Sequence, residues 1–291
     1  MKRLVLPIAV IALCAVCAAA AQRYSATGLV LKVDRAHQTI LVSCEDIPGY
    51  MNAMAMPFAV SDSKELDGLE PGIRVDFTIV VDKGTSQAKN IRIRDFESVE
   101  QEPQAARRLK LAQALATPDP PASPLRVGQP VPNFNLLDQS RQPVSLSQFA
   151  GAVVVVNFIY TRCPLPNFCF RLSNNLASLQ KRFHNRLRRD LQLLTITFDP
   201  QRDQPETLAS YARTWNADPH GWRFLTGAPE DIQKICGMFG VNSWPDEFLL
   251  THSLQTAIVD RQGKLAARLE GNQFTAEQLG DLVETVLDQS E

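Results

Sequence analysis

The sequence has no excess of basic charge and few histidines. Among 291 residues, 30 lysines and arginines are set against 31 aspartates and glutamates, for a formal net charge of −1, and only four residues are histidine. Domains that bind nucleic acid usually carry a basic patch and a positive net charge. The composition therefore excludes nucleic acid as an expected partner. Cysteine is also scarce, with six in the whole chain.

The N-terminus has the profile of a signal peptide. The positive start Met1-Lys2-Arg3 precedes an apolar run that ends in small residues, with Ala19-x-Ala21 as a cleavage site. We expect residues 1–21 to be removed on export, although the apolar length also permits retention as a membrane anchor. Cleavage would remove Cys14 and Cys17 and leave four cysteines. It predicts a periplasmic protein or one on the outer face of the cytoplasmic membrane.

The mature chain, of about 270 residues, exceeds the usual size of one domain, which favours two. Residues 24–96 alternate apolar and polar side chains between turn signals such as Glu70-Pro71-Gly72. Five short strands of this kind predict a small all-β, OB-like barrel. Residues 97–125 are rich in Glu, Gln, Ala, Arg and Pro, and we interpret them as a flexible linker.

The C-terminal part, residues 126–291, alternates strands with helices. Val153 to Tyr160 is a continuous apolar run, which is typical of a strand buried on both faces. Further strands are expected at 191–198, 255–259 and 265–269, and helices at 170–187, 205–215, 229–239 and 275–287. This order predicts an α/β domain with a central sheet and helices on its faces.

Two cysteines flank the end of the first buried strand. Cys163 follows the strand, and Cys169 stands where the next helix begins. Backbone N–H groups at a helix start favour the thiolate, so the pair could close a disulfide or bind a soft metal. Strand ends in α/β sheets are where ligands usually bind, although a structural disulfide remains an alternative. His252 could add a third ligand, but a lone histidine is more often an ordinary residue.

Residues 132–287 resemble the Sco/SenC family. The matching segments are Asn157-Phe158-Ile159-Tyr160-Thr161-Arg162-Cys163-Pro164, Phe198-Asp199-Pro200-Gln201-Arg202-Asp203, Trp222-Arg223-Phe224-Leu225-Thr226-Gly227 and His252-Ser253. The resemblance implies a thioredoxin-like fold that binds one copper ion through Cys163, Cys169 and His252 and helps to assemble the copper centre of cytochrome oxidase. The family usually separates its cysteines by three residues, whereas here five intervene.

Three further residues near these motifs have open or ordinary interpretations. Asp199 could orient the site or cap the following helix, and Asp203 is expected to be a helix-start residue. Cys236 lies on an amphipathic segment, which indicates a buried small hydrophobe. The C-x-x-C spacing of ordinary thioredoxin-like reductases is missing, which disfavours classical dithiol exchange without removing it.

Methionines gather in the N-terminal part of the chain. Met51, Met54 and Met56 are three of the five methionines, and Met54 and Met56 are two apart, so on a strand their thioethers share a face. Cys44 ends the preceding strand and could add a sulfur. Thioether and thiolate ligands select Cu(I) over hard cations, although core packing is the alternative.

Residues 25–94 also resemble the CusF-like periplasmic copper-binding barrels. That family binds Cu(I) or Ag(I) through one histidine and two methionines beside a tryptophan. The resemblance implies that Met54 and Met56 are the paired methionines and that Cys44 holds the histidine position. In this resemblance, Tyr50 and Met51 stand near the position where the family has its tryptophan.

Together, the two halves predict a copper chaperone. The barrel would acquire Cu(I) and pass it to Cys163, Cys169 and His252, and from there it would reach a copper-receiving subunit of cytochrome oxidase or another copper protein. One alternative is a thiol-disulfide oxidoreductase, with Cys163 attacking a partner's disulfide and Cys169 resolving the intermediate. The other is periplasmic sequestration of copper or silver.

Overall fold

The computed structural model describes residues 21–82, 84–95, 124–241, 243–246 and 249–289, with side chains described outside 243–252. Residues 1–20 of the predicted signal peptide and nearly all of the predicted linker lie outside these residues. Within the described ranges, every helix is too short or too polar to cross a membrane.

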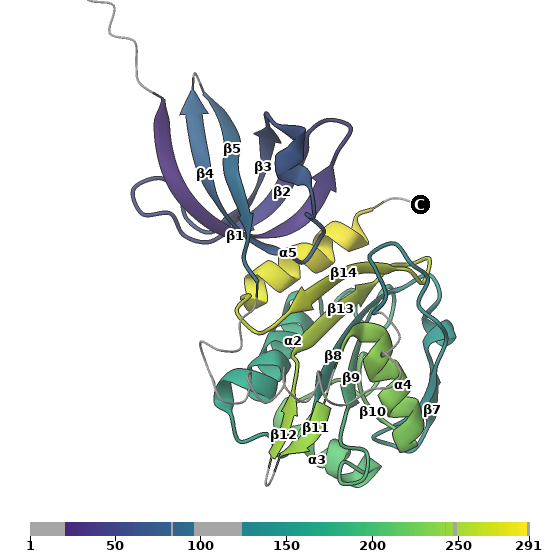
Figure 1. The fold of residues 1–291 in the computed structure, drawn as a ribbon. Helices are drawn as coiled ribbons and strands as arrows, with labels where there is room; N and C mark the ends of the chain where they lie inside the picture. Colours follow the sequence, from purple (N-terminus) through teal and green to yellow (C-terminus); the bar gives the residue numbers. More distant parts are fainter. Residues whose placement is uncertain (1–20, 83, 96–123, 242, 247–248, 290–291) are drawn as a thin grey trace, which may run out of the picture.

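The N-terminal domain is a closed five-stranded barrel, which confirms the predicted all-β class (Figure 1). Strand order around it is β1-β2-β3-β5-β4, with antiparallel pairs except for the parallel pair of β3 and β5. The strands are β1 (Gln22–Asp34), β2 (Thr39–Cys44), β3 (Met54–Val60), β4 (Arg74–Asp82) and β5 (Thr85–Ile93).

The C-terminal domain is built on a seven-stranded mixed sheet of order β14-β13-β8-β9-β10-β6-β7. The strands are β6 (Asn135–Asp138), β7 (Pro143–Ser145), β8 (Val153–Ile159), β9 (Leu191–Thr197), β10 (Trp222–Thr226), β13 (Gln255–Val259) and β14 (Leu265–Glu270). The helices are α2 (Arg171–Arg182), α3 (Pro205–Thr214), α4 (Pro229–Phe239) and α5 (Ala276–Leu287), and a separate hairpin joins β11 (Ser243–Asp246) to β12 (Leu249–His252).

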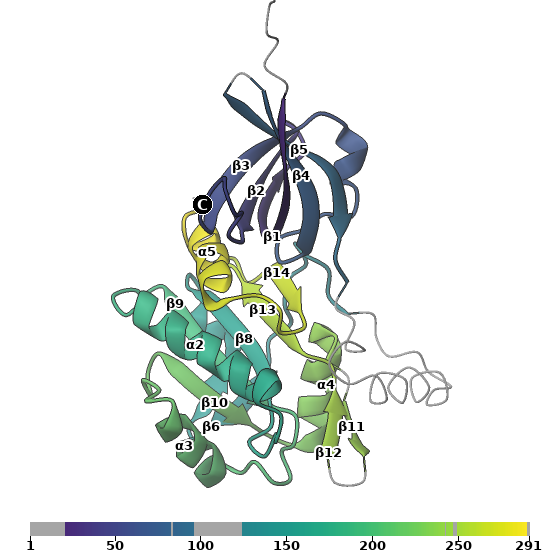
Figure 2. The same cartoon turned by 90° about the vertical axis from the view of Figure 1, so that its left-hand side faces the viewer.

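The sheet separates two apolar layers. Along β8, Val153 and Val155 pack with α2, α3 and α5, whereas Val154 and Val156 pack with α4 on the other face. Figures 1 and 2 show α2 and α4 on opposite sides of the sheet. This arrangement confirms the predicted α/β domain and explains why β8 is apolar throughout, because both of its faces are covered.

The barrel and the α/β domain share a core. In β1, Val30 packs inside the barrel, whereas its neighbours Leu29 and Leu31 point outward and belong to the apolar cluster of the other domain. Leu29 and Leu31 are almost fully buried, and α5 lies directly against β1 and β2 (Figure 1). The two domains are therefore joined by packing as well as by the chain between them.

Candidate metal centres

The fold brings Cys163 and Cys169 together despite the five residues between them. β8 delivers the chain to Thr161, and residues Pro166–Phe170 then wind as a wide π-helical turn that begins with a proline and runs into α2. The side chain of Cys169 is hydrogen-bonded to that of Cys163. Cys169 is buried, whereas Cys163 is partly exposed. Two sulfurs at the carboxyl end of a central strand can close a disulfide or hold one soft metal ion.

The electrostatics of Cys169 differ from the sequence-based expectation. Burial raises the pKa of its thiol well above the usual value, and the hydrogen bond and charge of Cys163 add to the rise. The expected lowering by the helix start is wrong because removal of the sulfur from water outweighs it. A metal ion at this site must therefore displace the proton of Cys169.

Two buried aspartates hold the segment that carries Cys163. The carboxylate of Asp203 accepts hydrogen bonds from the amide of Thr161 (3.0 Å), the hydroxyl of Thr161 (2.5 Å) and the hydroxyl of Thr197 (2.6 Å). Asp203 is fully buried, and Gln204 rather than Asp203 occupies the N-cap of α3, so the expected helix-start role is wrong.

Asp199 acts on the same segment from a second position. Its carboxylate accepts a hydrogen bond from Arg162, the residue before Cys163, at 3.1 Å. The sequence left two roles open for Asp199, as a residue that orients the site or as a helix cap. The contact with Arg162 favours the first role, and the N-cap of α3 is Gln204. Both aspartates lie in the turn after β9, the strand that pairs with β8. The segment that follows β9 therefore holds the loop that carries Cys163.

Tyr211 is a neighbour of the cysteines that the sequence did not reveal. Burial, with a smaller contribution from the nearby charge of Cys169, raises the pKa of its hydroxyl to about 12. Its hydroxyl lies 3.0 Å from that of Ser173 on α2. Tyr211 lies on α3, about 40 residues after the cysteines and outside the motifs. Its position beside them follows from the contact of α3 with α2, which the sequence pattern does not reveal.

His252 ends β12 and pairs through its backbone with Ser243. Its side chain lies outside the described residues, and its predicted role as a ligand stays a prediction. Across the parts of the chain that the structure describes, three or more His, Cys, Asp or Glu side chains do not gather as a metal site. Cys236 is buried, as expected for a small hydrophobe, and burial raises its pKa to about 12.

The barrel places the predicted sulfur ligands on one face of two paired strands. Cys44 of β2 stands directly opposite Met54 of β3, and Met56 stands opposite Val42. Opposed residues and residues two apart share a face, so the three sulfurs lie on the same face of the strand pair. Cys44 and Met56 pack against the barrel core on that face. Met51 packs against the same core, and Tyr50 stacks on Tyr24 with ring centroids 4.2 Å apart, at the tryptophan neighbourhood of the resemblance.

Exposure differs sharply within this set. Cys44 is 1% exposed and Met54 is 51% exposed, so the methionine is reachable from solvent and the cysteine is not. Burial and the charge of Glu45 raise the pKa of Cys44 to about 12. Like Cys169, it carries a proton that a metal ion must displace.

Comparisons with known proteins agree with this division. Residues 124–288 match the profile of the SCO1/SenC family, and residues 23–93 match that of the copper binding periplasmic protein CusF. A candidate copper-binding protein of Stutzerimonas stutzeri is 29% identical over 144 residues, which is 48% of this chain and 68% of that protein. Protein sco1 of Schizosaccharomyces pombe is 28% identical over 154 residues, or 50% and 56% of the two chains.

The matches thus span between half and about two thirds of the length of these two relatives. The solved structure of a candidate electron transfer protein from Aquifex aeolicus is 18% identical, with a TM-score of 0.50, and covers 55% of this chain and 94% of its own. That likeness concerns the fold alone. Because the SCO1/SenC profile extends over more than half of the sequence, the chain belongs to the SCO1/SenC family, and a CusF-like domain precedes the family domain.

Proposed function

We propose that this protein is an exported copper chaperone that binds Cu(I) through Cys163, Cys169 and His252. It would deliver the ion to the copper-receiving subunit of a cytochrome c oxidase or to another copper protein. The observation that carries this proposal is the contact between the side chains of Cys163 and Cys169 at a strand end of a SCO1/SenC domain. Paired thiolates with an imidazole are a ligand set that suits Cu(I).

The surroundings of the pair favour a preorganised site. Asp203 and Asp199 fix the residues before Cys163, so that sulfur has a defined position before metal arrives. Cys169 is buried in an apolar layer, where a thiol reacts poorly with oxidants. We expect an oxidant to reach Cys163 before it reaches Cys169. Such a site can hold copper and still release it to a partner that approaches from the side of the partly exposed Cys163.

We propose that the barrel carries a second Cu(I) site made by Cys44, Met54 and Met56, with Met51 beside it. The register of β2 and β3 and the match of residues 23–93 to CusF support this assignment. Met54, half exposed, would be the first sulfur that an incoming ion meets. The N-terminal signal pattern and the periplasmic family of the barrel support export to the periplasm or the outer membrane face.

A thiol-disulfide oxidoreductase is the second candidate, and the unequal exposure of the cysteines favours it. Cys163 would attack a partner's disulfide, and Cys169 would then displace the partner, which leaves a Cys163 to Cys169 disulfide and a reduced partner. Sequestration of copper or silver without delivery is the third. His252 distinguishes the oxidoreductase from the two copper-binding candidates, because copper binding uses it and dithiol exchange does not.

Deletion of the gene tests delivery. We expect loss of cytochrome oxidase activity that added copper partly restores, with little change in copper sensitivity. Complementation with Cys163→Ser should fail, whereas Cys236→Ser, a matched control at a buried cysteine outside the site, should restore activity. Full oxidase activity in the deletion strain, together with copper sensitivity, would instead indicate sequestration.

A further inference from the structure

One segment, residues 272–281, contacts the surroundings of both candidate copper sites. On the cysteine side, the amide of Asn272 donates a hydrogen bond to the backbone carbonyl of Asn167. Asn167 belongs to the turn between Cys163 and Cys169, and Asn272 is almost fully buried. We call residues 272–281 the bridge segment.

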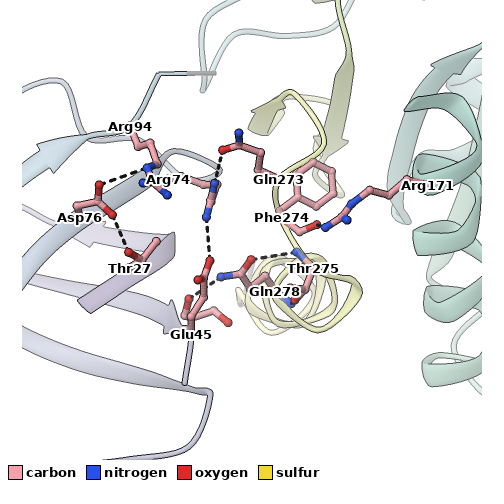
Figure 3. A network of polar contacts seen from close by, with 11 residues as sticks. Thr27, Glu45, Arg74, Asp76, Arg94, Arg171, Gln273, Phe274, Thr275 and Gln278 are labelled. Carbon is pink, nitrogen blue, oxygen red and sulfur yellow. Dashed lines mark hydrogen bonds and ion pairs between the residues drawn. The ribbon is translucent and has the colours of Figure 1, made fainter. Parts of the chain in front are cut away.

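On the barrel side, the bridge segment contacts Ser43, which precedes Cys44, and in the described part of the chain it reaches Glu45, which follows Cys44, only through Arg74 (Figure 3). Gln278 donates to the backbone carbonyl of Ser43 at 3.2 Å, and the hydroxyl of Ser43 donates to Asp281 at 2.7 Å.

Arg74 of β4 completes the contact. Its guanidinium donates to Gln273 at 2.5 Å and to Glu45, the residue after Cys44, at 2.8 Å. The chain on either side of Cys44 is therefore tied to the same segment that ties the cysteine turn.

The barrel site also borders a cleft that reaches the turn between Cys163 and Cys169, although neither of these two cysteines lines it. A cleft of about 650 Å³ between the domains is lined by Cys44 and Met54 from the barrel and by Asn167 from the cysteine turn, with the bridge segment along it. Outward-facing Leu29 and Leu31, buried in the core of the α/β domain, hold the barrel in this position. The barrel site thus lies beside the cysteine turn in the docked molecule.

We propose that Cu(I) passes from the barrel site to Cys163 and Cys169 within one docked chain, by way of this cleft and the turn that carries Asn167, and that the bridge segment positions the two sites for the transfer. The inference rests on the proposed function, because it requires copper at both sites.

The transfer is ligand exchange without a change in oxidation state. Bonds from copper to Cys163 and Cys169 form as the bonds to Cys44, Met54 and Met56 break. The two thiols of the acceptor lose two protons, one of which returns to the Cys44 thiolate and the other of which goes to solvent. Tethering at a fixed distance raises the effective concentration of acceptor at the donor, so the rate should not depend on protein concentration.

Exchange NMR on the reduced full chain tests the proposal. With ¹³C-methyl methionine and one equivalent of Cu(I), the Met54 and Met56 signals report whether the barrel is loaded. We expect a copper exchange rate that stays constant over a tenfold range of protein concentration. Mixed chains, one Cys163→Ser/Cys169→Ser and the other Met54→Leu/Met56→Leu, should exchange at a rate proportional to concentration.

Variants of the bridge segment test positioning. Asn272→Ala and Gln273→Ala/Gln278→Ala should slow exchange at least tenfold while each site keeps its Cu(I) affinity. Asn133→Ala is the matched control, because Asn133 accepts hydrogen bonds beside β7, at the opposite edge of the sheet from β14. If a bridge variant fails to fold, the concentration dependence of the exchange rate in the unmodified chain still tests the proposal.

Two results would overturn the relay alone: an exchange rate in the intact chain that rises with concentration, or bridge variants that exchange as fast as the control. Failure of one site to bind Cu(I) at all would overturn the proposed function together with the relay, and a titration distinguishes that case before any rate is measured.

Discussion

The shared core predicts that damage to the barrel destabilises the other domain. Leu31 lies in the barrel strand β1 but is 1% exposed and packs in the apolar cluster of the α/β domain. Removal of a buried leucine side chain costs about 2–5 kcal/mol, including the cavity left behind. With a urea dependence of about 3 kcal/mol per M, Leu31→Ala should lower the unfolding midpoint by about 1 M.

Tryptophan fluorescence gives a domain-specific readout of this change. All three tryptophans, Trp215, Trp222 and Trp244, lie in the C-terminal domain. A lower urea midpoint of tryptophan fluorescence in Leu31→Ala therefore shows that a barrel residue supports the other domain.

Two controls bound the result. Leu31→Met keeps the volume and should lose less than about 1.5 kcal/mol. Ile93→Ala removes a side chain that is 43% exposed on β5 and should change the midpoint little. A tryptophan transition that is unchanged in Leu31→Ala, while far-ultraviolet circular dichroism shows that the barrel unfolds earlier, would refute the shared core.

Three further results are expected. Asp203→Ala should lower the free energy of unfolding by about 3 kcal/mol, because the hydroxyl of Thr161 and the buried hydroxyl of Thr197 lose their acceptor. Thermal unfolding measures this change, and a loss below about 1 kcal/mol would contradict the expectation. Iodoacetamide at pH 7 should alkylate Cys163 of the reduced protein faster than Cys169, which is buried with a raised pKa; equal rates by peptide mass spectrometry would disagree. In Cys163→Ser/Cys169→Ser, the Cu(I) affinity of the barrel should rise about tenfold per pH unit from about pH 6 to 9. The sign follows because copper displaces one proton from Cys44, whose pKa of about 12 keeps it protonated over this range, so a flat profile in a chelator competition would exclude Cys44 as a ligand.

Local signals in the sequence were sufficient to place several elements. The helix predicted at 229–239 agrees at both ends with α4, because Pro229 suits a first helical turn and Gly240, at φ 76°, supplies the left-handed residue that ends it. The buried strand β8 was likewise evident from its apolar run. The meeting of Cys163 with Cys169 followed from their places around the end of β8 and from the family resemblance.

Features set by distant residues were not accessible in the same way. The alternation in β1 indicated two faces but not that Leu29 and Leu31 face another domain, because both faces of that strand are covered. The raised pKa of Cys169 comes first from its burial, in an apolar cluster that also includes residues of β8 and against which Tyr211 of α3 packs. The link from Asp203 to Thr161 spans 42 residues, and no local pattern marks it.

Anaerobic titration of the reduced mature protein with Cu(I) tests the central claim most directly. The account predicts two bound ions in the intact chain, one tight site lost in Cys163→Ser/Cys169→Ser and weakened in His252→Ala, and the other lost in Met54→Leu/Met56→Leu. No tight binding in the intact chain, alongside a readily reducible disulfide between Cys163 and Cys169, would contradict a copper chaperone and leave the oxidoreductase.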